Sequence, residues 1–533
     1  MAKYIFITGG VVSSLGKGIT AASLGMLLKK RGFRVTIQKI DPYINIDPAT
    51  MSPQQHGEVF VTEDGGEVDL DLGHYERFTD ENMTRANNVT MGRIYWAVIQ
   101  KEREGVYQGA TVQVIPHITN EIRDRIRRAA NDTQAEVVIT EIGGTVGDIE
   151  SLPVLEAIRQ MRYSEGSGDV MYIHVTLLPM LSKAGELKTK PTQHSVKELR
   201  SIGIRPDMIV CRTEVPIDDS VREKIALFCD TDVDSIFARP DMDNIFEVPL
   251  NLAEQGMDDA VLRRLNLEAP PAELDEWRDL IARIKKPQSH NVQIGLVGKY
   301  VSLRDAYLSV SEALDHAGYA LDTSVNLRWI DSESLTALNV EQELDGLDGI
   351  IVPTGSGGKG VDGMILAARY AREQKVPYFG IGMGMQVAAI DIAQSLIGWE
   401  DADSAEFDEE SEHHVIDLVP EQKDSTTANL VRLGASPCRL VENSLAYSAY
   451  ESSLIYERHN HKYEINNRFR KELQDAGLIF SGMSPDDRLI EIMELPGHPW
   501  FIGVSFNPEF KSRPQRAHPL FLSFINEAKK QSN

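Results

Sequence analysis

Short apolar segments alternate with longer amphipathic segments along the first half of the chain. The apolar segments lie at residues 4–10, 35–41, 136–144, 170–179 and 207–212, and each is short, bounded and rich in β-branched residues. Such runs are typical of strands buried on both faces of a parallel sheet. The segments between them favour helices, and Gly32 follows one of these as a helix C-cap. This pattern predicts a doubly wound α/β domain over residues 1–266.

A second α/β pattern follows a polar connection. Residues 267–290 contain a Pro-Pro pair and end near a Lys-Lys-Pro stretch, which predicts a linker with one short helix. Apolar segments at 292–298, 349–355 and 377–382 then predict a second doubly wound domain over residues 291–533. The fold class is therefore α/β, with two domains.

Length and composition narrow the possible functions. A chain of 533 residues is too long for one core, and its net charge of −25 argues against nucleic acid or an anionic membrane as a partner. The three cysteines are far apart, so we expect reduced thiols in a cytoplasmic protein. The sequence contains no apolar signal core and no apolar run of membrane-spanning length.

A glycine-rich segment, TGGVVSSLGKGIT at residues 8–20, follows the first predicted strand and opens the first predicted helix. Glycines there let backbone N–H groups approach phosphate oxygens, and Lys17 adds a cation. Ser13, Ser14 and Thr20 contribute hydroxyl groups. The match to the usual phosphate-loop pattern is imperfect, since Gly18 stands where that pattern has a hydroxyl residue. The position after the first strand still predicts a phosphate site.

Two further groups of side chains fit a nucleotide site. Asp71 and Glu141 are candidates for Mg²⁺ ligands, although either could be a surface carboxylate. Lys188, Lys190 and Gln193 precede a predicted helix and suit a second phosphate-bearing substrate. A solvated charge cluster is the alternative.

The segment GIGMGMQ at residues 380–386 has the layout of a nucleophile elbow, in which a reactive side chain sits on a tight turn between a strand and a helix. The turn contains Gly382 and Met383, and neither side chain can attack a carbonyl carbon. The layout of this turn therefore predicts a nucleophile, whereas its residues do not supply one.

Long motifs explain this disagreement. Six segments of the first domain together resemble the amidoligase domain of the CTP synthase family. They are GGVVSSLGKGI, KIDPYINIDPATMSPQQHGEVFVTEDG, DLDLGHYERF, GATVQVIPHIT, EIGGTVGDIESLP and KTKPTQHSVKEL. VGKYVSLRDAYLSVSEALDHAG and HPWFIGVSFNPEFKSRP resemble its class I glutamine amidotransferase domain. The resemblance covers essentially the whole chain.

The resemblance implies a P-loop-like amidoligase domain in which ATP and Mg²⁺ phosphorylate the 4-oxygen of UTP, after which ammonia displaces phosphate at C4 to give CTP. Ammonia normally comes from glutamine hydrolysis in the second domain, which GTP stimulates. CTP inhibits at a site that overlaps the UTP site. Members form tetramers, and some form filaments.

The resemblance also assigns residues. It implies Lys17 and Lys39 as the catalytic cations, and Asp71 and Glu141 as Mg²⁺ ligands. The implied ATP-binding residues are Ser14, Leu15, Gly16, Lys17, Gly18, Ile19 and Asp71. The implied UTP- and CTP-binding residues are Ser13, Asp148, Ile149, Glu150, Lys188, Thr189, Lys190, Pro191, Thr192, Gln193 and Lys224.

The second domain departs from the family pattern where glutamine would react. Gly382 stands at the position of the cysteine nucleophile and Asn507 at that of the histidine base, while Glu509 keeps the orienting carboxylate. The segments PTGSG (353–357), ANLVRLG (428–434) and Asn460 differ at the expected oxyanion hole, lid and glutamine-carboxylate positions. Without a thiol and an imidazole there is no thiolate, so we expect the glutaminase to be inactive.

Three functions remain open from sequence. The first is a ligase that uses free ammonia and UTP, and the second is a ligase that uses another amine or a related nucleotide to make an N4-modified cytidine nucleotide. The third is a non-catalytic regulatory or filament partner. Cys438 lies away from the elbow and is not expected to replace the nucleophile, and His459 and His461 fit a structural role better than a metal site.

Overall fold

The computed structural model describes residues 2–181, 185–418 and 431–532, which form two compact units. The first unit contains the chain up to Thr50 together with Asp71–Ile281. The second contains Met51–Leu70 together with the chain from Ala282 onward. The sequence places residues 51–70 in the first domain, whereas in the structure they pack with the second unit. Each unit is described by itself.

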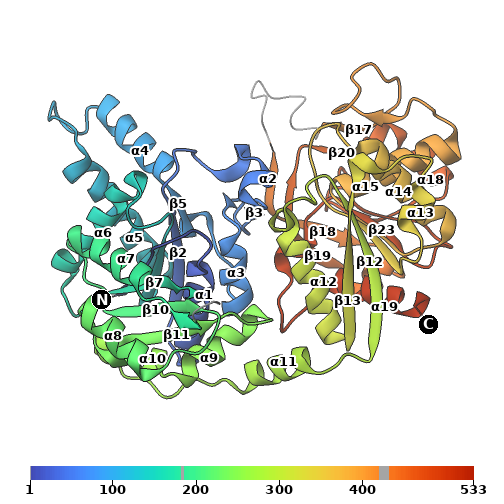
Figure 1. Cartoon of the computed structure of the whole chain (residues 1–533). Coiled ribbons are helices and arrows are strands. Elements are labelled where there is room, and N and C mark those ends of the chain that lie inside the picture. The colour runs from blue at the N-terminus through green and yellow to red at the C-terminus, as the bar shows by residue number, and fades with distance from the viewer. Residues whose placement is uncertain (1, 182–184, 419–430, 533) are drawn as a thin grey trace. The chain divides into compact units, whose positions relative to one another are not determined.

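A parallel sheet of seven strands forms the centre of the first unit within the described residues, with helices on both of its faces (Figure 1). The strand order is β11-β10-β7-β1-β6-β2-β5. The strands are β1 (Lys3–Gly9), β2 (Val35–Asp41), β5 (Asn88–Thr90), β6 (Val137–Ile142), β7 (Val170–Leu178), β10 (Met208–Thr213) and β11 (Ile236–Pro240). The five strands expected from sequence are confirmed, whereas β5 and β11 are short and were not predicted.

Helices of the first unit follow these strands along the chain. They are α1 (Lys17–Lys30), α3 (Asp71–Thr79), α4 (Met91–Arg103), α5 (Thr119–Thr133), α6 (Leu152–Glu165), α7 (Lys190–Ser201), α8 (Asp219–Cys229), α9 (Val248–Glu254), α10 (Met257–Leu265) and α11 (Asp275–Lys285). The last of these is the short helix predicted in the linker, and it continues past Ile281, where the first unit ends. Two short strands, β8 (Met180–Leu181) and β9 (Glu186–Leu187), form an antiparallel pair before α7.

The second unit is built on a mixed sheet of nine strands in the described part of the chain, ordered β13-β12-β14-β15-β23-β22-β21-β18-β19. Strands β12 to β15 and β23 run parallel, and the remaining strands pair antiparallel. The strands are β12 (His290–Gly298), β13 (Thr323–Asp331), β14 (Gly349–Val352), β15 (Tyr378–Ile381), β18 (Arg432–Leu440), β19 (Leu454–His461), β21 (Ile479–Met483), β22 (Ile490–Glu494) and β23 (Phe501–Val504). Only the β12, β14 and β15 segments were predicted.

Smaller elements complete the second unit. Its helices are α2 (Pro53–His56), α12 (Leu308–Ala320), α13 (Val340–Leu344), α14 (Val361–Gln374), α15 (Met383–Ile392), α17 (Leu445–Tyr450), α18 (Arg470–Asp475) and α19 (Pro519–Gln531). A small sheet contains β16 (Asp403–Ser404), β17 (His414–Leu418) and β20 (Tyr463–Ile465), and a hairpin joins β3 (Phe60–Val61) to β4 (Glu67–Val68).

The hairpin at residues 60–68 is tied to the antiparallel half of the second sheet. The Ala435 backbone N–H donates to the Glu63 carbonyl at 2.9 Å, and Nη1 of Arg458 donates to the Val61 carbonyl at 3.0 Å. The Arg458 side chain is fully buried and pairs with Glu63 at 3.2 Å. These contacts explain why the segment belongs to the second unit.

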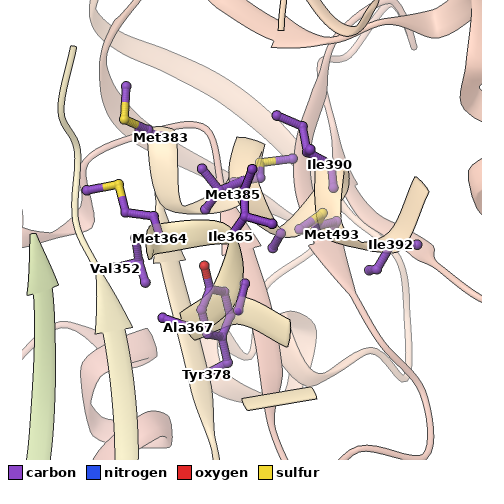
Figure 2. Packing of buried hydrophobic residues seen from close by; sticks show 14 of the residues in the cluster. Val352, Met364, Ile365, Ala367, Tyr378, Met383, Met385, Ile390, Ile392 and Met493 are labelled. Atoms are coloured by element: carbon purple, nitrogen blue, oxygen red, sulfur yellow. The ribbon is translucent and has the colours of Figure 1, made fainter. Parts of the chain in front are cut away.

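Apolar side chains pack tightly around α15. Figure 2 shows Met383 and Met385 of this helix beside Met364 of α14 and Val352 of β14, and all four are buried. The close packing fixes the helix that begins directly after Gly382. No helix in the described ranges is both long and apolar enough to cross a lipid bilayer.

Candidate functional site

The glycine-rich loop lies between the end of β1 and the start of α1, as predicted. Gly16 has φ 81°, a left-handed conformation that glycine adopts without strain. A Cβ atom at Gly18 would collide with the Asp71 carboxyl group, so glycine is required at this position for a steric reason. The start of a helix of 14 residues supplies backbone N–H groups and a partial positive charge. The local structure suits phosphate binding.

Two arginines that the sequence analysis missed hold this loop. Nη1 of Arg212 donates to the Ser14 carbonyl at 2.7 Å, and Nη2 of Arg239 donates to the Leu15 carbonyl at 2.5 Å. Burial lowers the pKa of Arg239 to about 10, which still leaves it charged near neutral pH. Arg212 ends the apolar segment DMIVCR. A cation at the end of this predicted strand could have identified Arg212 as a residue near the phosphate loop.

The structure brings the predicted catalytic and metal residues together beside the loop. Lys39 on β2 lies in register with Glu141 on β6, and the Lys39 ammonium group forms a short ion pair with Asp71. Nζ of Lys17 donates to the Gly144 carbonyl at 2.6 Å. Burial lowers the pKa of Lys17, although the nearby Glu141 opposes that change. Lys17, Lys39, Asp71 and Glu141 therefore form one electrostatic cluster.

The two carboxyl groups of this cluster differ in their protonation behaviour. Burial and the neighbouring Asp71 carboxylate raise the pKa of Glu141 to about 7, and the Tyr75 hydroxyl donates a short hydrogen bond to it. Burial also opposes ionisation of Asp71, but the Lys39 ammonium group holds the Asp71 pKa below its ordinary value. Two adjacent carboxyl groups offer hard oxygen ligands that fit Mg²⁺. No group of three or more metal-ligating His, Cys, Asp or Glu side chains occurs in the described ranges, so such an ion would draw its other ligands from phosphate and water.

The predicted UTP-binding residues lie on segments that follow the carboxyl ends of β1, β6 and β7. Ser13 is exposed in the loop, and the Asp148 carboxylate accepts the Thr145 N–H at 2.8 Å beside the exposed Ile149 and Glu150. In a doubly wound domain, this edge of the sheet is where ligands bind.

The other predicted UTP-binding residues gather around the start of α7. Lys188 pairs with Glu186 at 2.7 Å, and Nε2 of Gln193 donates to the Thr189 hydroxyl at 3.0 Å. Lys190 lies 5.4 Å from the Phe228 ring centroid. Lys224 of α8 is close enough to Glu186 to help lower the pKa of that carboxyl group, for which the Lys188 hydrogen bond is the larger cause. Pro191 and Thr192 complete the first turn of the helix.

In the second unit, the turn between β15 and α15 has the backbone of a nucleophile elbow. Gly382 adopts φ 54° and ψ −106°, its N–H donates to the Val504 carbonyl at 2.8 Å, and its carbonyl accepts the Met385 N–H at 3.0 Å. A Cβ atom at Gly382 would lie closer than 3.0 Å to the Thr354 hydroxyl. The space beside the turn is therefore already filled by Thr354.

Asn507 and Glu509 face the same place. Nδ2 of Asn507 donates to the Thr354 hydroxyl at 3.2 Å and to Oε1 of Glu509 at 2.9 Å. Asn507 and Glu509 are buried, and burial raises the pKa of Glu509 to about 8. The three side chains form a hydrogen-bonded row that contains neither a thiol nor an imidazole.

The loop after β14 is tied down by a lysine and a glutamate. Nζ of Lys299 donates to the carbonyls of Ser356, at 3.2 Å, and Gly357, and burial lowers the pKa of Lys299 to about 8. The Glu406 carboxylate accepts the Gly357 N–H at 2.8 Å. Asn460 is half-buried on β19. Residues 428–430 of the predicted lid lie outside the described residues.

The remaining candidate side chains are buried. Nδ1 of His459 lies 2.9 Å from Nε2 of His461, and burial lowers the pKa of both imidazoles, which keeps them neutral. Cys438 lies on β18 with no exposed surface, and burial raises its thiol pKa. A buried thiol with a raised pKa is a poor nucleophile.

Comparison with known proteins gives matches to both units. Residues 3–267 match the family model "CTP synthase N-terminus", and residues 302–527 match "Glutamine amidotransferase class-I". A CTP synthase of Clostridium acetobutylicum is 60% identical over 527 residues, which cover 99% of this chain and 98% of that protein. A CTP synthase of Carboxydothermus hydrogenoformans is 60% identical over 531 residues, 99% of either chain. The solved glutaminase domain of a Trypanosoma brucei CTPS with bound acivicin is 38% identical and covers 45% of this chain and 94% of that one, with a TM-score of 0.43.

Proposed function

Because this chain belongs to the CTP synthase family, we propose that it is an ATP-dependent ligase that aminates UTP with free ammonia instead of glutamine. The γ-phosphoryl group of ATP moves to the 4-oxygen of UTP. Ammonia then attacks C4 and phosphate leaves with its oxygen, which gives CTP, ADP and phosphate after loss of the extra protons.

The cluster beside the loop supports the phosphoryl-transfer step. Phosphoryl transfer requires alignment and charge neutralisation more than a covalent residue. Lys17 at the helix start and Lys39 beside Asp71 would neutralise the transferring group. Asp71 and Glu141 would hold Mg²⁺, which when bound offsets the charge of the phosphate oxygens. Ser14, Leu15, Gly16, Gly18 and Ile19 would supply the loop and helix start that receive ATP.

The proposed acceptor site lies along the same edge of the sheet. Ser13, Asp148, Ile149 and Glu150 border the ends of β1 and β6, and the start of α7 contributes the cations and hydroxyl groups. CTP would compete with UTP there as a feedback inhibitor. We also propose, from the family resemblance, that the chain assembles into a homotetramer and that the tetramers can form filaments.

The observation that carries the choice of ammonia is the row Thr354–Asn507–Glu509 beside Gly382. A class I amidotransferase cleaves glutamine with a thiolate that a histidine generates. Here Gly382 has no side chain at the nucleophile position, and Asn507 has an amide at the base position. The Thr354 hydroxyl fills the space between them. Loss of a protease nucleophile alone costs about a million-fold in rate. We therefore propose that this unit does not hydrolyse glutamine at a useful rate.

The test compares nitrogen donors on the full chain. The protein is incubated with UTP, ATP and Mg²⁺, and with either ammonium chloride or glutamine plus GTP, and products are read by mass spectrometry. We expect CTP with ammonium, at a rate that rises with pH in proportion to the unprotonated ammonia, and none with glutamine. Glutamine-dependent CTP at a comparable rate would refute the proposal. A panel of primary amines distinguishes an N4-modified product, and the lack of turnover with every donor would favour a regulatory partner.

A further inference from the structure

A buried row of three polar side chains lies directly under the phosphate loop. Thr8 belongs to β1, His174 to β7 and Ser195 to α7, and their exposed fractions are 1%, 0% and 7%. Oγ1 of Thr8 lies 2.9 Å from Nδ1 of His174, and Nε2 of His174 lies 2.8 Å from Oγ of Ser195. The row thus joins the strand before the loop to a helix that is distant in sequence.

One direction satisfies every hydrogen bond of the row. The Thr8 hydroxyl can donate to the Ile173 carbonyl at 3.4 Å, and in that arrangement it accepts from the Nδ1–H group of His174. Nε2 of His174 then accepts the proton of the Ser195 hydroxyl. Burial, with a smaller effect from Lys17, lowers the pKa of His174 to about 3, so the ring stays neutral.

The phosphate loop rests on this row at Gly10. A Cβ atom there would overlap Oγ of Ser195 and would lie 3.0 Å from Nε2 of His174. The Gly10 N–H donates to the Val175 carbonyl at 3.1 Å, which holds the loop against β7. The loop at Gly10 therefore packs directly against Ser195 and His174.

The same row reaches the helix that we assign to UTP. Ser195 lies within the first two turns of α7, shortly after Lys190 and Gln193. Thr192 is also bonded to β7, since its hydroxyl lies 3.1 Å from both the Thr176 hydroxyl and the Leu177 carbonyl. The Ser195–His174 bond is the link that continues from α7 to β1.

We propose that His174 is a positioning residue that couples the ATP loop to the UTP helix through Thr8 and Ser195. This inference rests on the proposed function, because that function assigns α7 to UTP. Occupation of one subsite fixes the row, and the fixed row lowers the cost of ordering the other subsite. His174 itself touches neither nucleotide.

A double-mutant cycle tests the coupling. Thr8→Val and Ser195→Ala each remove one end of the row with little change in volume. Dissociation constants for UTP and for a non-hydrolysable ATP analogue with Mg²⁺ are measured by calorimetry on the full chain. We expect each single variant to weaken both nucleotides by about 3- to 10-fold, which is the effect of one lost hydrogen bond. The double variant should be no weaker than the worse single variant.

Controls separate coupling from loss of structure. Ser201→Ala removes a hydroxyl from the far end of the same helix and should leave both dissociation constants unchanged. His174→Asn keeps the donor toward Thr8, whereas His174→Ala removes both contacts, so the asparagine variant should bind the ATP analogue more tightly than the alanine variant. Melting temperatures identify any variant that is unfolded.

The possible outcomes are distinct. Additive effects in the double variant, or a Thr8→Val variant that changes only the ATP analogue and a Ser195→Ala variant that changes only UTP, would overturn the coupling and leave the proposed function intact. A wild-type chain that binds ATP but not UTP would refute the proposed function, and the coupling with it.

Discussion

Thr354 fills the space beside Gly382 into which an elbow nucleophile would project. Its hydroxyl lies closer than 3.0 Å to the position that a Cβ atom at Gly382 would take, and it accepts a hydrogen bond from Asn507 at 3.2 Å. The position that a side chain at residue 382 would enter is thus occupied by Thr354. A thiol introduced at residue 382 and an imidazole introduced at residue 507 would both lie against Thr354.

We expect Gly382→Cys with Asn507→His to remain without glutaminase activity. A Cβ atom at this position overlaps the Thr354 hydroxyl, so we expect Thr354 to keep the new cysteine from the geometry in which its thiol attacks glutamine. Glutamate release should stay within about threefold of the wild-type background. Adding Thr354→Gly, which removes the obstructing side chain, should raise the rate at least about tenfold above that of the double variant.

The control for this series is Thr354→Gly alone. It clears the space but adds no nucleophile, and it should release no glutamate. Strong activity in the double variant, before Thr354 is changed, would show that the threonine is no obstacle.

Glu509 gives a prediction for stability as a function of pH. Burial raises the pKa of its carboxyl group to about 8, whereas in the unfolded chain the group ionises near its ordinary value. The folded state therefore holds an extra proton between these two values, and the stability contributed by Glu509 is lost as pH rises across that window. Glu509→Gln removes this loss, so at pH 8 it should melt about 2–8 °C above the wild type.

The same variant should melt near the wild-type temperature at pH 4, which lies below both pKa values, so that the glutamate is mostly protonated in both states. Glu341→Gln, at an exposed position on α13, is the matched control and should shift neither value. A Glu509→Gln variant that melts below the wild type at pH 8 would mean that the ionised carboxylate stabilises the fold.

Lys39 gives a prediction for catalysis. Its ammonium group lies between Asp71 and, at 3.8 Å, Asp41, and we propose that it neutralises a transferring phosphoryl group. Lys39→Met should lower ammonium-dependent CTP formation about 100- to 1,000-fold with little change in overall fold. Lys530→Met, at an exposed position near the C-terminus, should leave the rate unchanged. A Lys39→Met rate within about threefold of the wild type would remove Lys39 from the catalytic site.

Sequence alone predicted the parts of the fold that continuous apolar runs encode. Strands β1, β2, β6, β7 and β10 are buried along nearly their whole length, so most of their residues are apolar and their boundaries agree closely with prediction. Strand β13 alternates in burial and lies at the edge of its sheet, and no such run marks it. The placement of residues 51–70 depends on contacts such as Glu63 with Arg458, which no local pattern encodes.

The candidate site shows the same limit. The loop and its lysines carry local signals, since a phosphate site requires glycine and cations at a strand end. Sequence marked Thr354 only as part of the altered segment 353–357, because its contacts with Gly382 and Asn507 depend on how closely the loop after β14 approaches the elbow. Arg239 and His174 likewise act through partners distant in sequence, at Leu15 and Ser195.

A buried ion pair at the C-terminal end of α1 gives the last prediction. Arg31 bonds to Asp258 at 2.6 Å and to Asp259 at 2.5 Å, and the exposed side-chain fractions are 6% for Arg31, 4% for Asp258 and 57% for Asp259. Removing the buried partner leaves a guanidinium charge without its full compensation, and this costs more than the loss of an exposed one. Asp258→Ala should therefore lower the melting temperature by about 5–10 °C, and Asp259→Ala by less than about 3 °C. Calorimetry of the full chain checks both variants, and equal shifts for the two would show that burial does not decide the strength of this pair.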